Sequence, residues 1–445
     1  MKMFEVIKGI FGKKATLKHV TLDGVRIHLN IKERKMWING YYVLRLNRSA
    51  TDLLEAFIDA CYEVPPNRVV ERAIAKMGRA AKRSVLEQDL QQLVGIINEF
   101  AKGKIPCHLV GVKNVTEQKS APNRMDVSIT YTCNNRCPHC YLPSNKDPAG
   151  TLTTEQWKQV IDKLWSLGIP QIVYSGGECT QQADKLVELV AHAKQFVTGI
   201  ISNGTLVTKQ LAVDLRKAEL DWIQITLNSH KGITHDQMEG RPGAYDETLR
   251  GIRNSITAGI VTNVNMTLTQ KNKDDLPALI DLCKKLGVSQ VSTNALINSG
   301  RGSSARNLEG IPEAQLQTIL ENGKKHAAKV GIDFNWYLPT CYHNFNPESL
   351  GFGTRNCSAC SVNLMIEPDG QVIPCQSWTQ NKLGNILKND WESIWNNPLA
   401  VQIRQHAYAA QTCKSCEHFR KCGGACPLET LNAGKSLRTC GGMQK

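Results

Sequence analysis

The chain contains 445 residues, a length that predicts two or three domains rather than one core. No apolar run is long enough to span a bilayer, which argues against a membrane protein. Lysines interrupt the apolar residues of the N-terminal stretch MKMFEVIKGIFGKK, so we expect no secretory signal and a cytoplasmic location. The net charge of +14 suits an acidic partner, but no Lys/Arg block is long enough to favour nucleic acid.

Sixteen cysteines are the most informative feature of the composition. Three of them fall within residues 133–140 and eight lie between Cys357 and Cys440. In a long chain without a signal sequence, such clusters indicate metal ligation rather than disulfides. Cys61, Cys107 and Cys283 stand alone and are interpreted as ordinary buried thiols.

The first 105 residues predict a small α+β domain. Two strand-like runs, 25–31 and 36–46, are separated by a charged turn. Three helical patterns follow, the first opening at Ser49, the second near 69–77 and the third over 86–100. A polar stretch leads out of this domain, so residues 106–124 are predicted to be a linker.

From residue 125 the pattern changes to strand–helix alternation. Six strand-like runs occur: DVSITYT, QIVYS, VTGIIS, WIQITL, VTNVNMTL and VSQVSTNAL. The helical patterns that follow them cover 153–167, 181–196, 208–219, 245–258, 274–286 and 312–330. Such units predict a parallel sheet with right-handed crossovers. Six units fall short of a closed eight-stranded barrel, so residues 125–340 predict an open, partial (β/α)6 TIM-like barrel with its site at the strands' C-terminal ends.

After residue 340 the periodicity fades, and glycines, prolines and cysteines become frequent. This composition is typical of a region where metals replace a large apolar core. Residues 341–445 therefore predict a separate, cysteine-rich domain.

The first strand of the barrel ends in a loop with Cys133, Cys137 and Cys140. Three thiolates at this spacing can bind three irons of a 4Fe–4S cluster and leave the fourth iron open to a ligand. The competing interpretation is a zinc site with His139 as its fourth ligand. The position of the loop at the C-terminal end of the first strand favours the iron–sulfur cluster.

This cysteine triplet resembles the C-x-x-x-C-x-x-C signature of the radical S-adenosylmethionine (radical SAM) superfamily, and the resemblance covers residues 125–335. After the second strand, Gly176-Gly177-Glu178 matches the GGE motif of that family, with Cys179 where a proline is usual. The resemblance implies that these three residues bind the amino group of S-adenosylmethionine.

Weaker matches follow at the ends of the next two strands. Ser202 and Asn203 end the third strand, where relatives carry a similar T-N-G. Thr226 and Asn228 end the fourth strand, in a segment like the family's S-x-D-G, and Asn228 replaces the usual Asp. The resemblance implies contacts to ribose or substrate. Hydrogen bonds within their own loops are an equal alternative for each residue.

The C-terminal cysteines are spaced as in the SPASM extension of radical SAM enzymes, which carries two auxiliary 4Fe–4S clusters. The resemblance implies that the first cluster is held by Cys357, Cys360, Cys375 and Cys426. It implies that the second is held by Cys413, Cys416, Cys422 and Cys440. Cys341 competes with Cys357 for its place, and two zinc sites with four cysteines each remain an alternative.

The N-terminal domain resembles the PqqD-like recognition element, a winged-helix-like fold, through NGYYVLRLNRSATDLLEAF and the helices after it. In relatives this module binds the leader of a precursor peptide, which adds a strand to its exposed edge. A structural cap on the barrel is the alternative.

Together these resemblances imply a radical SAM/SPASM maturase that removes a hydrogen atom from a ribosomal precursor peptide to install a cross-link or similar change. They imply S-adenosylmethionine and three 4Fe–4S clusters as cofactors, and an electron donor such as flavodoxin or ferredoxin. Alternatives are the maturation of another protein, a reaction on a small molecule such as a tetrapyrrole, and a zinc-stabilised binding protein without catalysis. The sequence assigns no side chain as a catalytic acid or base.

Overall fold

The computed structural model describes residues 17–22, 25–31, 34–38, 42–45, 48–60, 71, 74–75, 83–101, 120–143 and 145–428. The chain divides into two compact units. One comprises Met1–Lys119, Asp162–Gln171 and Ala193–Val197, and the other comprises the remaining residues. Among the described residues, no helix combines the length and apolar character that crossing a membrane requires.

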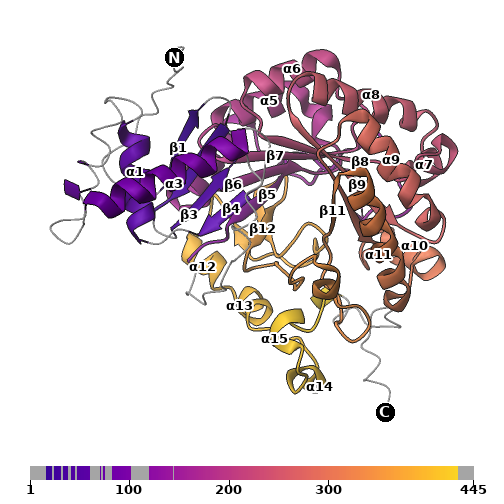
Figure 1. The fold of residues 1–445 in the computed structure, drawn as a ribbon. Coiled ribbons are helices and arrows are strands. Elements are labelled where there is room, and N and C mark those ends of the chain that lie inside the picture. Colours follow the sequence, from indigo (N-terminus) through magenta and orange to yellow (C-terminus); the bar gives the residue numbers. More distant parts are fainter. Residues whose placement is uncertain are drawn as a thin grey trace. The chain divides into compact units, whose positions relative to one another are not determined.

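The described residues of the N-terminal part include a four-stranded antiparallel sheet and the two helices α1 (Arg48–Ala60) and α3 (Arg83–Ala101) (Figure 1). The strands, in sheet order, are β1 (Leu17–Leu22), β2 (Val25–Asn30), β3 (Lys35–Ile38) and β4 (Tyr42–Arg45). Ile27, Leu29 and Met36 of the sheet are fully buried, as are Leu53 and Leu54 of α1. The apolar face of α1 thus forms part of this core.

Two expectations for this part were incomplete. The single strand predicted over 36–46 is a hairpin of β3 and β4, in which Ile38 pairs with Tyr42. The intervening sequence contains Asn39-Gly40, a strong hairpin-turn pair. Strand β1 was not predicted. The first and third helices are confirmed as α1 and α3, whereas the helix predicted near 69–77 lies largely outside the described residues.

The larger part is built on a ten-stranded sheet, seven strands of which follow one another in chain order. These are β5 (Arg124–Ser128), β6 (Gln171–Ser175), β7 (Val197–Ser202), β8 (Trp222–Thr226), β9 (Val261–Leu268), β10 (Gln290–Ala295) and β11 (Asp333–Trp336). The pairs from β7 through β11 are parallel. The six predicted strands are confirmed, and β11 is an additional one.

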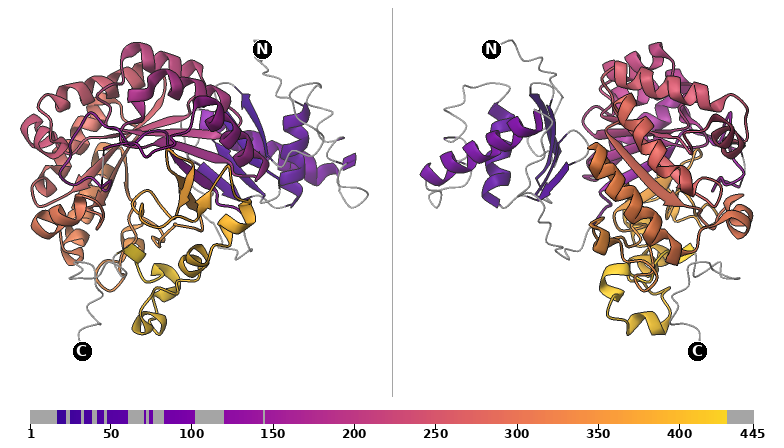
Figure 2. Two further views of the ribbon diagram at one scale, coloured as in Figure 1. Left: turned by 180° about the vertical axis from the view of Figure 1, so that it is seen from behind. Right: turned by 45° about the vertical axis from the view of Figure 1, so that its right-hand side comes forward.

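Helices cover the outer face of these strands in an arc (Figures 1 and 2). The six predicted helices correspond to α4 (Thr154–Ser166), α5 (Ala183–His192), α6 (Lys209–Lys217), α8 (Ala244–Thr257), α9 (Leu276–Leu286) and α11 (Glu313–Val330). Two short helices, α7 (Gly232–Glu239) and α10 (Gly302–Glu309), lie in loops after β8 and β10. The sheet ends at β11 on one side and does not close, which confirms an open α/β barrel.

The C-terminal segment continues the barrel sheet. Strand β12 (Asn363–Ile366) pairs in parallel with β5, and β13 (Gln371–Ile373) and β14 (Gly384–Asn385) extend the sheet antiparallel. Short helices complete the segment: α12 (Trp391–Trp395), α13 (Pro398–Arg404), α14 (Gln411–Lys414) and α15 (Phe419–Cys422). The fading periodicity after residue 340 gave no indication of this shared sheet.

Strands β8, β9 and β10 are polar on one face and apolar on the other. Their register aligns Thr226, Asn265 and Ser292 in one row, and Thr267 with Asn294 in the next. Because side chains alternate along a strand, the residues between them point the other way. Four of these are apolar and fully buried, namely Ile225, Val264, Met266 and Val291, and Thr293 is a buried polar exception. The interior of the barrel is therefore lined with polar side chains.

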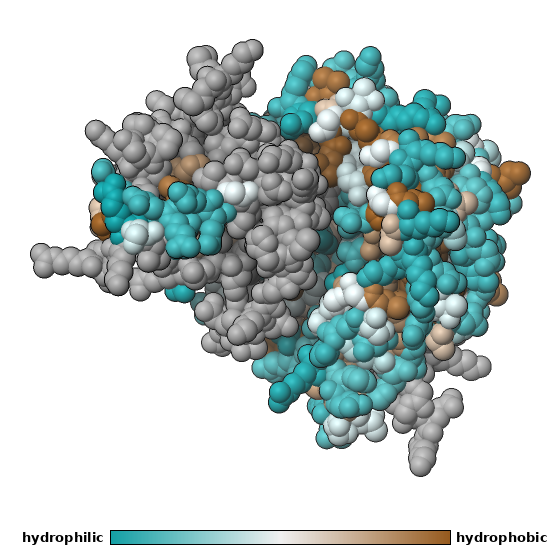
Figure 3. All heavy atoms as spheres, in the orientation of Figure 1, coloured by the Kyte–Doolittle hydropathy of each residue, from teal (hydrophilic) through white to brown (hydrophobic). Residues whose placement is uncertain are grey.

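The outer surface is mostly hydrophilic on the face drawn in Figure 3, with separate apolar patches rather than one continuous band. The large apolar side chains that are exposed among the described residues are Ile233, Leu308, Tyr337 and Val362. Singly exposed apolar residues are normal for a globular protein.

Gly251→Ala provides a test of the helix packing. A Cβ on Gly251 of α8 would lie 2.0 Å from the carbonyl oxygen of Gly204, which is too close for van der Waals contact. The backbone would have to move to make room for this Cβ. We therefore expect the free energy of unfolding to fall by about 1–3 kcal/mol, as measured by anaerobic calorimetry. The control is Gly95→Ala on α3, where a Cβ meets nothing within 4 Å. It should stabilise its unit by about 1 kcal/mol. Parent-like stability of the Gly251 variant would contradict the packing.

Candidate cofactor and substrate site

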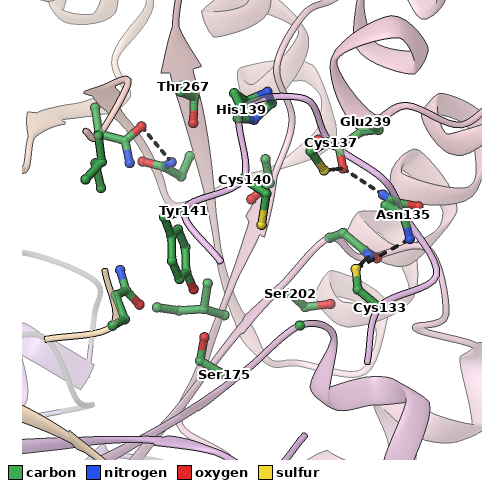
Figure 4. A pocket seen from close by; sticks show the side chains of 18 of the residues that line it. Cys133, Asn135, Cys137, His139, Cys140, Tyr141, Ser175, Ser202, Glu239 and Thr267 are labelled. Carbon is green, nitrogen blue, oxygen red and sulfur yellow. Dashed lines mark hydrogen bonds between the residues drawn. The ribbon is translucent and has the colours of Figure 1, made fainter. Parts of the chain in front are cut away.

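Three cysteines border one cavity at the C-terminal ends of the barrel strands (Figure 4). Cys133, Cys137 and Cys140 lie on the loop after β5, and all three are free thiols. The residues lining the cavity are Cys133, Asn135, Cys137, His139, Cys140, Tyr141, Ser175, Gly176, Gly177, Ile201, Ser202, Asn203, Gln224, Thr226, Glu239, Asn265, Thr267, Asn294, Ala295, Leu296, Ile297 and Gln376. The structure thus brings the predicted triplet together.

Burial disfavours the thiolate form at each of these cysteines. It raises the pKa of Cys133 to about 12 and raises the pKa values of Cys137 and Cys140 as well. A bound cation would offset this penalty, since metal coordination deprotonates thiols. The donor set therefore fits a positively charged metal centre.

The cysteines and nearby acidic groups do not converge as ligands of one ion would. Among the described residues, no group of three or more His, Cys, Asp or Glu side chains could hold a single metal ion. A 4Fe–4S cube does not need such convergence, because each thiolate binds a different iron. His139, the candidate zinc ligand, lines the cavity, and burial lowers its pKa to about 4.

The GGE turn supports the cysteine loop through its backbone. Gly177 N donates to Thr130 O at 2.9 Å and Glu178 N donates to Thr132 O at 2.8 Å. A Cβ on Gly176 would lie 2.1 Å from Thr130 O, and one on Gly177 would lie 2.2 Å from Thr132 O. Both glycines are therefore required for the turn to approach the segment that leads into Cys133.

The side chain of Glu178 is fully engaged by the protein. Its Oε1 accepts hydrogen bonds from the hydroxyl of Ser202 at 2.8 Å and from both the amide and the hydroxyl of Thr180. Its Oε2 accepts from the amide of Asn203 at 2.7 Å. Glu178 is 1% exposed and is not among the cavity-lining residues. In this structure the carboxylate positions Ser202 and Asn203, which do line the cavity. Its binding of the amino group stays a prediction.

A second buried carboxylate, Glu239 at the end of α7, was not singled out from the sequence. Its carboxylate accepts hydrogen bonds from Asn135 Nδ2 at 2.6 Å, from the thiol of Cys137 at 3.2 Å and from Asn228 Nδ2 at 2.8 Å. Burial raises the pKa of Glu239, and these three donors oppose that rise. Asn228 is thus directed toward Glu239, and it does not line the cavity. Its predicted cofactor contact stays a prediction.

The segment after β10 holds the other side of the cysteine loop. Arg301 Nε donates to Cys137 O at 3.0 Å, and Gly302 N donates to Cys140 O at 3.0 Å. The Ser299 hydroxyl bonds to the carbonyls of Tyr141 and Ser377, at 3.1 and 2.6 Å. The glycines flanking Arg301 in NSGRG were the available sequence signal, because they permit close backbone approach.

The C-terminal cysteines fall into two sets, and the first comprises Cys357, Cys360, Cys375 and Cys426. Burial raises the pKa values of Cys357 and Cys375, and the charges of other cysteines of this set raise both further. Arg404 donates to the carbonyl of Cys360 at 3.1 Å and stacks on Trp395, with 4.3 Å between the guanidinium and the ring. The four predicted ligands of the first auxiliary cluster therefore share one electrostatic environment.

The second set comprises Cys413, Cys416 and Cys422. Burial raises the pKa of Cys413, and the charges of Cys422 and Cys416 raise it further. Cys440, the predicted fourth ligand, lies outside the described residues. The imidazole of His343 lies 3.1 Å from the sulfur of Cys416 and was not predicted. Cys341, the alternative to Cys357, is fully buried and disulfide-bonded.

The first cysteine set is tied to the barrel through β12. The hydroxyl of Tyr131, two residues before Cys133, donates to Glu367 Oε1 at 2.7 Å. Glu367 also forms an ion pair with Lys382. Gln376, next to Cys375, lines the same cavity as the cysteine triplet. The segment that carries the first cysteine set thus contributes Gln376 to the cavity that the cysteine triplet borders.

Family models match both parts of this site. The radical SAM superfamily model matches residues 127–283, and the model of the iron–sulfur cluster-binding SPASM domain matches residues 357–417. The chain therefore contains a radical SAM domain and a SPASM domain, and it is an enzyme. Its radical SAM domain uses S-adenosylmethionine and a 4Fe–4S cluster, and its SPASM domain binds auxiliary iron–sulfur clusters.

Curated relatives have two kinds of activity. Fe-coproporphyrin III synthase of Methanosarcina barkeri is 29% identical, over 72% of this chain and 86% of that protein. The subtilosin biosynthesis protein AlbA of Bacillus subtilis is 28% identical, over 71% of this chain and 70% of that protein. Mycofactocin maturase MftC of Mycolicibacterium smegmatis is also 28% identical, over 71% of this chain and 81% of that protein. Identity alone does not separate haem-type from peptide-type chemistry.

A solved structure shares the fold over nearly the whole length. SuiB of Streptococcus suis, bound to its precursor peptide SuiA, matches with a TM-score of 0.64. The match covers 96% of this chain and 97% of that protein, with 15% identity. At this identity the likeness establishes the fold.

We predict that Gly177→Ala lowers the iron content. The added Cβ would displace Tyr131 and Thr132, whose carbonyl oxygens lie 2.4 and 2.2 Å from its position, and with them the approach to Cys133. After anaerobic reconstitution we expect about four fewer irons per chain than in the parent. Gly95→Ala, whose Cβ contacts nothing, is the control. Full iron content in the Gly177 variant would refute this role.

A second prediction concerns the auxiliary sites. Cys375→Ala should remove about four of the about twelve irons expected for three clusters, while the radical SAM cluster signal persists in paramagnetic resonance spectra. Cys283→Ala is the matched control, because Cys283 is a lone, fully buried thiol on α9. Loss of iron from the control but not from Cys375→Ala would contradict the assignment.

Proposed function

We propose that this enzyme is a maturase of ribosomally made peptides. The observation that carries the proposal is the N-terminal sheet that precedes the radical SAM and SPASM regions. SuiB, which binds a precursor peptide, matches 96% of this chain, so its fold also extends over most of this N-terminal part. In this proposal residues 1–105 recognise the peptide, and residues 125–340 and 341–445 carry the chemistry.

The N-terminal sheet offers edges for a leader peptide. In the described residues β1 and β4 each pair with one strand only, so one side of each is open to strand addition. Main-chain hydrogen bonds along such an edge would bind an extended leader, as in a PqqD-like module. A leader rich in acidic residues would be attracted by the net charge of +14.

The barrel residues would bind and orient the cofactor and the substrate. The bound cofactor and reduced cluster supply a 5′-deoxyadenosyl radical, which removes a hydrogen atom from an unactivated carbon. Cys133, Cys137 and Cys140 hold the cluster. Gly176, Gly177, Ser202, Asn203 and Thr226 line the cavity where the cofactor would bind. Leu296 and Ile297 add apolar surface that would limit water.

The auxiliary clusters that the two C-terminal cysteine sets would hold could accept the electron left over from a net oxidation. The cavity that contains the triplet also reaches Gln376, the neighbour of Cys375 in the first set. A small electron carrier such as flavodoxin or ferredoxin would reduce the radical SAM cluster.

A tetrapyrrole substrate is the second candidate. Fe-coproporphyrin III synthase of Methanosarcina barkeri is 29% identical over 72% of this chain, a similarity in the same range as that of the peptide maturases. Formation or turnover of an iron porphyrin such as Fe-coproporphyrin III by the purified enzyme, without peptide modification, would favour this candidate.

Deletion of residues 1–105 tests the recognition role. We expect the truncated enzyme to form 5′-deoxyadenosine with dithionite, because the cysteine triplet lies in the other part of the chain. It should lose modification of a precursor peptide encoded by a short reading frame beside the gene, followed by mass spectrometry. The triple variant Cys133→Ala, Cys137→Ala, Cys140→Ala is the negative control and should form no 5′-deoxyadenosine. Undiminished peptide modification by the truncated enzyme would refute the recognition role.

A further inference from the structure

One part of the cavity beyond the cysteine triplet is lined by uncharged polar side chains. Amide and hydroxyl side chains come from three neighbouring strands and from the SPASM region: Gln224, Thr226, Asn265, Thr267, Asn294 and Gln376. No Lys or Arg is among the described residues that line the cavity.

Glu239, the acidic side chain among the described lining residues, already has hydrogen-bond partners within the protein. It accepts hydrogen bonds from Asn135 at one oxygen and from Asn228 at the other, so both oxygens have partners even when Cys137 binds the cluster. A cationic substrate group would have to displace one of these donors. An anionic substrate group would meet this carboxylate and would find no Lys or Arg partner in the described lining. Outside the part that would hold the charged cofactor, the cavity therefore favours an uncharged substrate group over a charged one.

Two of these amides, Asn265 and Asn294, have partners within the barrel. Ser292 Oγ donates to Asn265 Oδ1 at 3.0 Å, and Asn265 Nδ2 donates to Asn294 Oδ1 at 3.4 Å. Gln376 differs, because its Oε1 atom is buried and has no hydrogen-bond partner among the described residues. A buried acceptor without a partner costs about 1–3 kcal/mol, so such groups in native proteins call for an explanation.

We propose that this part of the cavity is a subsite for an uncharged peptide segment, and that the carboxamide of Gln376 pairs with a peptide group beside the reacting carbon. A carboxamide presents one acceptor and two donors, which complement the N–H and C=O of a peptide unit. This inference rests on the proposed maturase function and narrows it. It assigns to position 376 a contact with substrate, and it disfavours a tetracarboxylate such as coproporphyrin in this part of the cavity.

Deuterium transfer provides the test. The holoenzyme is given S-adenosylmethionine, dithionite and millimolar acetyl-Ala-Xaa-Ala-amide, in which Xaa is perdeuterated Gln, Glu or Lys. Deuterated Fe-coproporphyrin III is the fourth probe. Deuterium in the isolated 5′-deoxyadenosine shows that the hydrogen atom came from the probe. The measured quantity is the ratio of deuterated to unlabelled 5′-deoxyadenosine in the same sample. We expect the Gln peptide to transfer about tenfold more deuterium than the other three probes.

Two variants at position 376 test the residue itself. Gln376→Leu should lower the deuterated fraction from the Gln peptide by about tenfold. Gln376→Glu should shift the preference toward the Lys peptide, because it places a carboxylate in the subsite. Gln380→Leu is the matched control: this glutamine is exposed, lies on the same loop and is not among the residues that line this cavity.

The outcomes separate this inference from the function on which it rests. Three results would each overturn the inference. The peptides could donate deuterium irrespective of their charge, or none of them could donate any. The Gln376→Leu enzyme could also transfer as much deuterium as the parent. Transfer from the porphyrin, together with none from the peptides, would overturn the maturase function as well.

Discussion

The cysteine loop after β5 depends on backbone contacts that side chains would prevent. Gly176 and Gly177 approach residues 130–132, Gly240 approaches Arg136 O, and Gly300 approaches Tyr141 O, so that a Cβ at each position would come within 2.1–2.4 Å of a carbonyl oxygen. These glycines belong to three different barrel loops. The loop is therefore held from three directions, and the positions of its thiols are set by main chain rather than by long side chains.

Two buried carboxylates also help to hold the cysteine loop in place. Glu178 and Glu239 each accept several hydrogen bonds, and in both cases burial raises the pKa while the donors oppose that rise. A buried acid with all of its oxygens satisfied acts as a fixed connector between chain segments. Glu178 connects the GGE turn with Asn203, and Glu239 connects α7 with Asn135 on the cysteine loop.

The sequence predicted the barrel well because local pattern and chain topology agree there. Six strands and six helices lie where their periodicity placed them. Cys133, Cys137 and Cys140 border the cavity because the one loop that carries them leaves β5 at the C-terminal ends of the barrel strands. Other features depend on contacts between distant segments, which periodicity does not encode. Glu239 gains its role only when α7 packs against Asn135, and Gln376 reaches the cavity only because its segment joins the barrel sheet. The strand β12 was missed for the same reason.

The pairing of β12 with β5 has a consequence for the modular view of such enzymes. Met365 and Asp126 are partners in one sheet, and β12 pairs with Arg124–Val127, so the strand that leads into the cysteine loop borders the SPASM region along most of one edge. Without β12, this edge would present unpaired main-chain groups to solvent. The SPASM region is thus a structural part of the barrel wall. Exchange of this region between relatives would require the matching surface of β5 to be transferred with it.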